Sequence, residues 1–382
     1  MICNTSSLNM TVSPFSDWNG CSSRRISFTI RDQKKRFSIS GTMLRNIDLE
    51  PGRCFVLSKT IFGVEMEARH SRSLNQFVYL FLFQFCSTLI PRLLQKFFSV
   101  VVGDLFFVLM KGTRENVRKN VEGIGQGRWS EKRMEALTRR TFQNYGQYLL
   151  DYMVMHRLRP SNQGQWIEEE VGGGHMAAAL QAGRGAICIT PHLGNWEIGG
   201  LLFSFKGGIL NVLTLDERDQ KTKSFREAMR GRKGIKNVYI DPRDESPMAI
   251  VDAVRALRRN EIVAMLGDRV QSQKTMIFDF FGKPTPFPIG VAILALATGA
   301  PVLPVFVVME KSRKYRAIIE APIAFRSDAR QKRDEAIKEG MEKMVKIFED
   351  YIARYPDQWY NFYDYWKEAG ERKERAFRSK RE

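Results

Sequence analysis

The chain has 382 residues, 43% of them apolar, and a formal net charge of +18 at pH 7, which describes a globular protein of one large domain or two smaller ones. The positive charge favours an acidic partner, such as nucleic acid, an anionic membrane surface or an acidic carrier protein, without choosing among them. The five cysteines are scattered without CxxC spacing, which argues against both a zinc module and a disulfide framework.

Residues 1–65 are rich in Ser, Asn, Arg and Lys and have no sustained hydrophobic period, so we expect a poorly ordered extension. No segment near the N-terminus combines a basic start, an apolar run and a small-residue cleavage site, which argues against a secretory signal peptide. At Met66, basic residues precede a strongly apolar segment. We therefore expect translation to begin at Met66 and the first 65 residues to be an artefact of the gene model. The intact mass of the native protein tests this expectation.

Residues 66–112 are predicted to form hydrophobic helices that anchor the chain to a membrane. No charged side chain occurs in Ser73–Ile90, which is close to the shortest apolar run that can span a bilayer. A basic break follows, and then a second apolar run, Phe97–Met110, that is interrupted by Asp104. Two apolar helices joined at a basic break favour insertion into one leaflet over a single span or burial in a soluble core.

A domain of α/β type is predicted over residues 113–367, with a charged tail at 368–382. Residues 114–155 carry helical periodicity, and after Gly183 short apolar runs alternate with amphipathic stretches. This alternation predicts a mixed sheet flanked by helices. The expected strands are Ala186–Thr190, Asn211–Leu215, Asn237–Asp241, Ile262–Leu266 and Val302–Met309. One expected helix begins at Trp196, and the others span Thr222–Arg232, Pro247–Arg259, Ile289–Thr298 and Gln331–Ile352.

The stretch PHLGNWE follows the first of these strands and contains a candidate acid–base pair. His192 and Glu197 lie five positions apart and would not share a face of a continuous helix. Pro191 and Gly194 permit an irregular turn that removes this restriction. Glu197 could then accept a hydrogen bond from one imidazole nitrogen of His192 and leave the other nitrogen free as a general base. From this motif alone, a helix N-terminus with an incidental histidine is the favoured interpretation.

Other catalytic chemistries find less support in the sequence. No GxSxG elbow is present, and Cys188 lies inside a predicted strand, where we expect a buried structural thiol. His192 has no second histidine nearby and no HExxH pattern, so we expect no metal site. A base without a nucleophile of its own indicates that a hydroxyl or amine of the substrate attacks.

Several short motifs follow one another in a fixed order along the chain. They are HLGNWE at 192–197, RxxxG at 230–234, GDR at 267–269, FFGKPTP at 280–286, GAPVLPVF at 299–306 and PDQW at 356–359. Together with the preceding apolar segment, they resemble the lipid A biosynthesis acyltransferases, the lauroyl and myristoyl transferase branch of the lysophospholipid acyltransferase superfamily. The resemblance covers roughly residues 70–367 and makes the catalytic interpretation of His192 the favoured one.

The resemblance implies a mechanism. His192 would deprotonate a hydroxyl of the acceptor, which attacks the thioester of an acyl chain on acyl carrier protein, while Glu197 orients the histidine. Backbone N–H groups at the start of the helix that begins at Trp196 are candidate donors to the oxyanion. No metal or organic cofactor is implied, because the thioester already carries the activation.

The resemblance also implies substrate-binding residues. Arg230 and Asp268 match family positions linked to catalysis or acceptor binding, and Gly282 and Thr285 match the motif expected to shape the acyl or acceptor pocket. Arg269 is a further candidate, because a guanidinium beside the site could hold a phosphate of the acceptor or of the carrier's pantetheine arm. Alternatives stay open, since Arg230 could belong to a solvated basic helix face and Asp268 could cap a turn.

The sequence departs from the family pattern in two places. The aromatic segment 358–366 is less basic than in the enterobacterial members, and GDRVQ is less acidic than the corresponding stretch in those members. The expected acceptor is therefore a lipid A precursor or a related glycolipid, with a lysophospholipid or an aminolipid as the alternative. A nonenzymatic basic protein that binds membranes or nucleic acid is a further alternative, but no RNP, KH or helix-turn-helix pattern accompanies the charge. We expect the cytoplasmic face of an anionic bacterial inner membrane, where acyl carrier protein is available.

Overall fold

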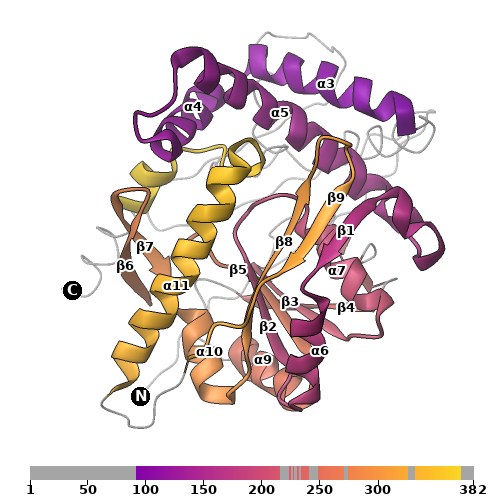
Figure 1. Cartoon of the computed structure of the whole chain (residues 1–382), viewed down its shortest axis with the longest axis vertical. Coiled ribbons are helices and arrows are strands. Elements are labelled where there is room, and N and C mark those ends of the chain that lie inside the picture. Colours follow the sequence, from indigo (N-terminus) through magenta and orange to yellow (C-terminus); the bar gives the residue numbers. More distant parts are fainter. Residues whose placement is uncertain are drawn as a thin grey trace, which may run out of the picture. The chain divides into compact units, whose positions relative to one another are not determined.

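The computed structural model describes residues 92–215, 223–224, 227, 230–231, 234–240, 248–270, 274–325 and 332–370 (Figure 1). The predicted extension at 1–65 and the first apolar run of the predicted anchor lie outside the described residues, as do most of the predicted helix Thr222–Arg232 and most of the charged tail.

Three helices at the start of the described residues form one layer. They are α3 (Arg92–Leu109), α4 (Lys111–Gly125) and α5 (Glu131–Val154), and α3 lies along α5 (Figure 1). Gly103 permits this close approach, because a Cβ there would lie 2.6 Å from the Cα of Gln143. Asp104 and Arg139 add an ion pair at 2.6 Å between the two helices. Within the described part of the chain, no helix combines the length and the apolar character needed to cross a membrane.

A seven-stranded sheet forms the centre of the domain, in the order β1-β9-β8-β2-β5-β3-β4. Strands β8 and β9 pair antiparallel and the other neighbours pair parallel, which confirms the prediction of a mixed sheet. The strands are β1 (Ile167–Val171), β2 (Ala186–Thr190), β3 (Leu210–Leu215), β4 (Ile235–Ile240), β5 (Ile262–Leu266), β8 (Val302–Met309) and β9 (Tyr315–Ile319).

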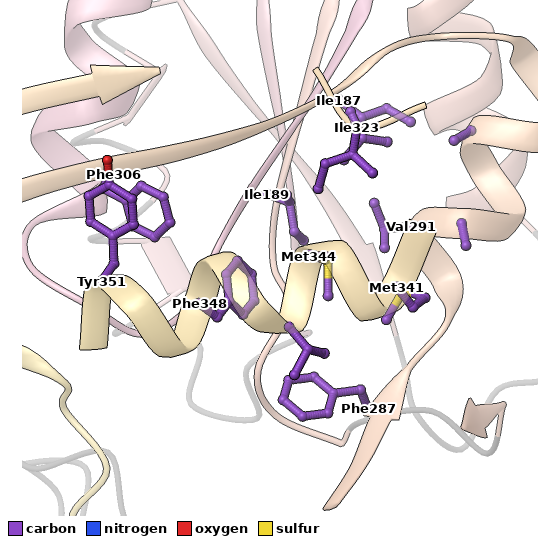
Figure 2. Close-up of a cluster of buried hydrophobic side chains, with 14 of the residues drawn as sticks. Ile187, Ile189, Phe287, Val291, Phe306, Ile323, Met341, Met344, Phe348 and Tyr351 are labelled. Atoms are coloured by element: carbon purple, nitrogen blue, oxygen red, sulfur yellow. The ribbon is translucent and has the colours of Figure 1, made fainter. Parts of the chain in front are cut away.

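Helices cover both faces of the sheet, as predicted. Side chains alternate along β2, so that Ile187 and Ile189 pack on one cluster of apolar residues, while Ala186 and Cys188 pack on another. The first cluster is supplied by α9 (Met248–Arg258), α10 (Gly290–Thr298) and α11 (Arg333–Arg354), and the second by α6 (Gly173–Gln181) and α7 (Trp196–Phe205). Figure 2 shows the first cluster, in which Met344 of α11 lies beneath Ile189.

A two-stranded hairpin, β6 (Thr275–Phe280) and β7 (Lys283–Pro288), contains the FFGKPTP motif. Phe281 and Gly282 form its turn, with φ values of 55° and 74°. Two successive residues with positive φ are the mark of a type I′ turn, which suits the twist of a tight hairpin. Because Phe281 is not glycine, its position needs support, and Glu349 of α11 accepts a hydrogen bond from its amide.

Candidate active site

The candidate site lies where two neighbouring parallel strands end. Strands β2 and β5 pair in register, with Thr190 opposite Leu266 at their carboxyl ends. His192 and Asp268 each follow two residues after these ends. The amide of Gly267 donates to the carbonyl of Thr190 at 2.9 Å, so the pairing continues beyond the strands. The topology therefore brings together two side chains that are 76 positions apart, at the sheet edge where binding crevices form.

The loop between β2 and α7 is held in one conformation by its backbone. The amide of Gly194 donates to the carbonyl of Gln358 at 3.0 Å, and the amide of Asn195 donates to the carbonyl of Val307 at 2.7 Å. Gly194 has a φ of 65°, and a Cβ there would lie 2.1 Å from the Val307 carbonyl oxygen, so only glycine fits. Asn195 caps α7, since its side-chain oxygen accepts from the amide of Ile198 at 3.2 Å.

His192 and Asp268 form a buried hydrogen-bonded pair. His192 Nδ1 lies 2.5 Å from Asp268 Oδ1, and the two residues are 8% and 0% exposed. An ionised carboxylate only accepts hydrogen bonds, which assigns the imidazole proton to Nδ1. Nε2 has no hydrogen-bond partner among the residues that the structure describes, so it is available as a base. The ring of Trp196 lies edge-on to the imidazole, with 5.5 Å between centroids.

The predicted hydrogen bond between His192 and Glu197 is wrong. Glu197 lies in the first turn of α7, on its buried side, and binds Arg230 instead. Arg230 Nε donates to one carboxylate oxygen of Glu197 at 3.1 Å, Nη2 donates to the other, and Nη1 donates to Asn237 Oδ1 at 2.7 Å. The loop before α7 turns His192 toward the end of β5, and the helix turns Glu197 toward β4. Asp268, which the sequence assigned to substrate binding, is the carboxylate at His192.

Arg230, which is predicted to bind substrate, is engaged by Glu197 and Asn237 instead. Arg230 is buried and forms a bidentate ion pair with Glu197. Burial opposes the charge of the guanidinium, but Glu197 outweighs burial and raises the pKa of Arg230. Three of its nitrogens are engaged within the protein, so this side chain fastens α7 to β4 and has little left for a substrate.

Burial and charge set the protonation of the pair. Burial lowers the pKa of His192 below its ordinary value of 6.5, the positive charge of Arg269 acts in the same direction, and Asp268 acts against both. Burial opposes ionisation of Asp268, but the interactions with His192, Arg269 and the indole N–H of Trp359 outweigh it and hold the pKa of this carboxyl well below its usual range. A neutral imidazole therefore faces a carboxylate near pH 7.

Arg269 lies beside the pair and is partly committed to the C-terminal segment. Its Nε donates to Asn361 Oδ1 at 2.9 Å, and its Nη2 donates to the carbonyl of Tyr360 at 2.7 Å. The guanidinium also lies over the ring of Tyr363, 5.4 Å from its centroid. The side chain is half-buried, and binding of a phosphate by its remaining donor stays a prediction.

The two predicted residues of the FFGKPTP motif lie in different surroundings. Gly282 is in the hairpin turn and lines a hollow of about 580 Å³ that does not include His192. Thr285 is fully buried, and its hydroxyl donates to the carbonyl of Lys283 at 2.9 Å. A fully buried hydroxyl that is already bonded within its hairpin has a structural role, which argues against contact between Thr285 and a substrate.

Cys188 is buried in β2, as the sequence predicted. Burial raises the pKa of its thiol to about 12, so it is protonated and unreactive. Within the described residues, no group of three or more His, Cys, Asp or Glu side chains is placed to hold a metal ion.

The comparisons with known proteins agree with the motifs. A family model described as bacterial lipid A biosynthesis acyltransferase matches residues 62–368. The chain is similar to the phosphatidylinositol mannoside acyltransferase of Mycobacterium tuberculosis (strain ATCC 25618 / H37Rv), with 28% identity over 169 residues, 43% of this chain and 52% of that protein. The corresponding protein of Mycolicibacterium smegmatis (strain ATCC 700084 / mc(2)155) is 25% identical over 201 residues, 52% of this chain and 64% of that protein. The matches thus span between half and two-thirds of these relatives.

Proposed function

Because the chain belongs to the bacterial lipid A biosynthesis acyltransferase family, we propose that it transfers a fatty acyl chain from a thioester donor to a hydroxyl of a glycolipid. The observation that carries this proposal is the buried pair of His192 and Asp268 at the ends of two neighbouring strands, with Nε2 of the imidazole unpaired among the described residues. A neutral imidazole in this setting is a general base without a protein nucleophile beside it, which suits attack by a hydroxyl of the substrate.

In the proposed reaction, His192 Nε2 takes the proton of the acceptor hydroxyl while its oxygen attacks the carbonyl carbon of the thioester. Asp268 stabilises the imidazolium that results. The tetrahedral intermediate then collapses, the C–S bond breaks, and the leaving thiolate takes the proton back from His192. The backbone N–H of Trp196, which has no acceptor among the described residues, is the proposed donor to the oxyanion.

The proposed donor is acyl carrier protein, and the proposed acceptor is a glycolipid. A net charge of +18 supports docking of an acidic carrier protein. The names of the mycobacterial relatives support a mannoside of phosphatidylinositol as one acceptor to test, beside a lipid A precursor. Both acceptors combine sugar hydroxyls with acyl chains and anionic phosphate, so the family and these relatives support the same class of substrate.

The proposed place of action is the cytoplasmic surface of an anionic bacterial membrane, with α3 lying in that surface. While one side of α3 packs on α5, the other side exposes apolar residues by 41–64%. These residues are Leu94, Phe97, Phe98, Val101, Leu105, Val108 and Leu109. An apolar helix face on a strongly basic protein suits insertion into the headgroup region of an anionic bilayer.

Transfer of a labelled acyl chain by the purified full chain tests the proposed function. Acyl carrier protein and coenzyme A would carry the label in parallel, and a lipid A precursor, a phosphatidylinositol mannoside and a lysophospholipid would serve as acceptors in detergent micelles. We expect labelled glycolipid from the carrier protein and at least a hundredfold slower formation by His192→Gln. Absence of transfer from both donors into both glycolipids, or undiminished transfer by His192→Gln, would overturn the proposal.

A further inference from the structure

The C-terminal segment Gln358–Tyr365 lies across the catalytic pair and contacts both of its halves. Leu193 and Trp359 form an antiparallel bridge between this segment and the loop that follows β2. On either side of the bridge, the amide of Tyr360 donates to the carbonyl of His192 at 2.8 Å, and the carbonyl of Gln358 accepts from Gly194. The backbone of the segment thus fixes the backbone of the histidine.

Side chains of the same segment hold Asp268. The indole Nε1 of Trp359 donates to Asp268 Oδ2 at 2.9 Å, and the hydroxyl of Tyr365 donates to the backbone carbonyl of Asp268 at 2.5 Å. Trp359 is almost fully buried, and its ring packs against Phe280, with 5.9 Å between ring centroids, and against Tyr365, with 4.7 Å between centroids. A ring that is fixed on several sides gives its N–H a fixed direction.

Among the described residues, each oxygen of the Asp268 carboxylate therefore has one hydrogen-bonding partner. Oδ1 faces His192 Nδ1 and Oδ2 faces Trp359 Nε1. Asp268 is fully buried, so water cannot replace a donor that is removed, and the carboxylate would turn or share Oδ1 to satisfy both oxygens. Either change weakens the hydrogen bond that keeps the imidazole proton on Nδ1 and leaves Nε2 as the base.

We propose that Trp359 is a positioning residue for the catalytic pair, whose indole N–H aims the Asp268 carboxylate at His192 Nδ1 and thereby selects the tautomer that can act as a base. The effect of Trp359 on catalysis rests on the proposed function. Its effect on the tautomer of His192 does not, because the tautomer can be measured in the resting protein. Among the described residues, Arg269, which follows Asp268, is the other charged group that acts on His192.

The test replaces Trp359 with benzothienylalanine, which keeps the size of the indole and lacks the N–H donor. Trp366 offers a matched control, because its ring packs in the same aromatic cluster, 5.9 Å from that of Trp359, while its buried Nε1 has no hydrogen-bond partner among the described residues. Nitrogen-15 shifts of selectively labelled histidine report the tautomer, and the chain has only four histidines to assign. Spectra are taken above the pKa of His192, where the ring is neutral.

We expect the unmodified protein to hold His192 as the Nδ1–H tautomer, and benzothienylalanine at 359 to raise the ratio of Nε2–H to Nδ1–H roughly fivefold, the loss of one hydrogen bond. Where acyl transfer is measured, kcat should fall with KM nearly unchanged. The same replacement at 366 should leave the tautomer ratio as it is. An unchanged ratio for the replacement at 359, or an equal change for both replacements, would overturn the proposal, whether or not the protein transfers acyl chains. Melting temperatures show that both proteins are folded.

Discussion

His192 Nδ1 lies 2.5 Å from Asp268 Oδ1, although the two residues are 76 positions apart and no motif links them. The contact follows from the topology, because β2 and β5 are parallel neighbours whose ends are in register and each residue comes two positions after its strand. Glu197, only five positions from His192, is turned away by the helix that carries it. The order of strands in the sheet, and not the spacing within the motif, therefore makes Asp268 the carboxylate that orients the proposed base His192.

The activity should depend on pH through His192. Burial lowers the pKa of His192 below 6.5, and the base is active only when neutral. As the pH falls, kcat/KM should therefore stay constant through pH 7 and decline only below about 6.5, the ordinary pKa of histidine. Asp268 stays ionised across that range, because its pKa is held far lower. A profile of kcat/KM from pH 5 to 9 measures this limb, and a decline that begins above pH 7 would contradict the assignment.

Breaking the ion pair of Glu197 and Arg230 should lower stability. Both side chains are buried, so Glu197→Gln leaves the Arg230 charge in a poorly solvated site. We expect a loss of roughly 3 kcal/mol in the free energy of unfolding, measured by denaturant titration. The double variant Glu197→Gln with Arg230→Gln should recover part of that loss, since no uncompensated charge remains buried. Equal stability of the wild type and Glu197→Gln would show that the pair contributes nothing.

Gly194, the glycine of the PHLGN turn, should tolerate no side chain. Gly194→Ala combines a positive φ with a Cβ 2.1 Å from the Val307 carbonyl oxygen, so we expect a cost of roughly 2–5 kcal/mol and reduced acyl transfer as the turn shifts. Gly207 is the matched control, because its φ is 78° but a Cβ there would meet nothing within 4 Å. Gly207→Ala should cost about 1 kcal/mol and leave the activity unchanged. Similar unfolding curves for the two variants would refute the steric argument.

The exposed face of α3 should enter the membrane. An environment-sensitive dansylalanine in place of Phe97 should shift its emission to the blue when the protein meets vesicles of phosphatidylethanolamine and phosphatidylglycerol. The same probe at Ile250, which is also exposed and belongs to α9, should show no shift, because α9 lies far from α3 in Figure 1. If the protein sediments with the vesicles and the probe at position 97 stays in water, α3 does not contribute to binding.

Much of the sheet could be predicted from the sequence. Strands β2, β5 and β8 are uninterrupted apolar runs, as expected for strands covered by helices on both faces, and their predicted bounds are those of the structure. Strands β1 and β9 are not predicted, because neither is an uninterrupted apolar run. Ile167–Val171 reads IEEEV, and Tyr315–Ile319 mixes polar and apolar residues. The hairpin β6–β7 also escaped, since Lys283–Pro288 contains three prolines and lies outside the main sheet.

The candidate site could be predicted only in part. The PHLGN turn was recognisable because it follows a strand and contains a glycine that the structure requires at a positive φ. The motif points to Glu197 as the partner of His192 because both residues lie in it, whereas the actual partner depends on which strands are neighbours. A signal for Asp268 was present, since it follows β5 by the same two residues as His192 follows β2. The hydrogen bond from Trp359 had no such signal, because it depends on where the chain returns after α11.

A double-mutant cycle in acyl transfer tests most directly whether His192 and Asp268 act as one base. His192→Gln and Asp268→Asn should each lower kcat/KM by roughly 10² to 10⁴, because either change removes a base of the correct tautomer. The double variant should be no slower than His192→Gln alone, since residues that act as a unit are not additive. Reductions that multiply in the double variant, or an Asp268→Asn protein with the activity of the wild type, would contradict the pairing of His192 with Asp268 in catalysis.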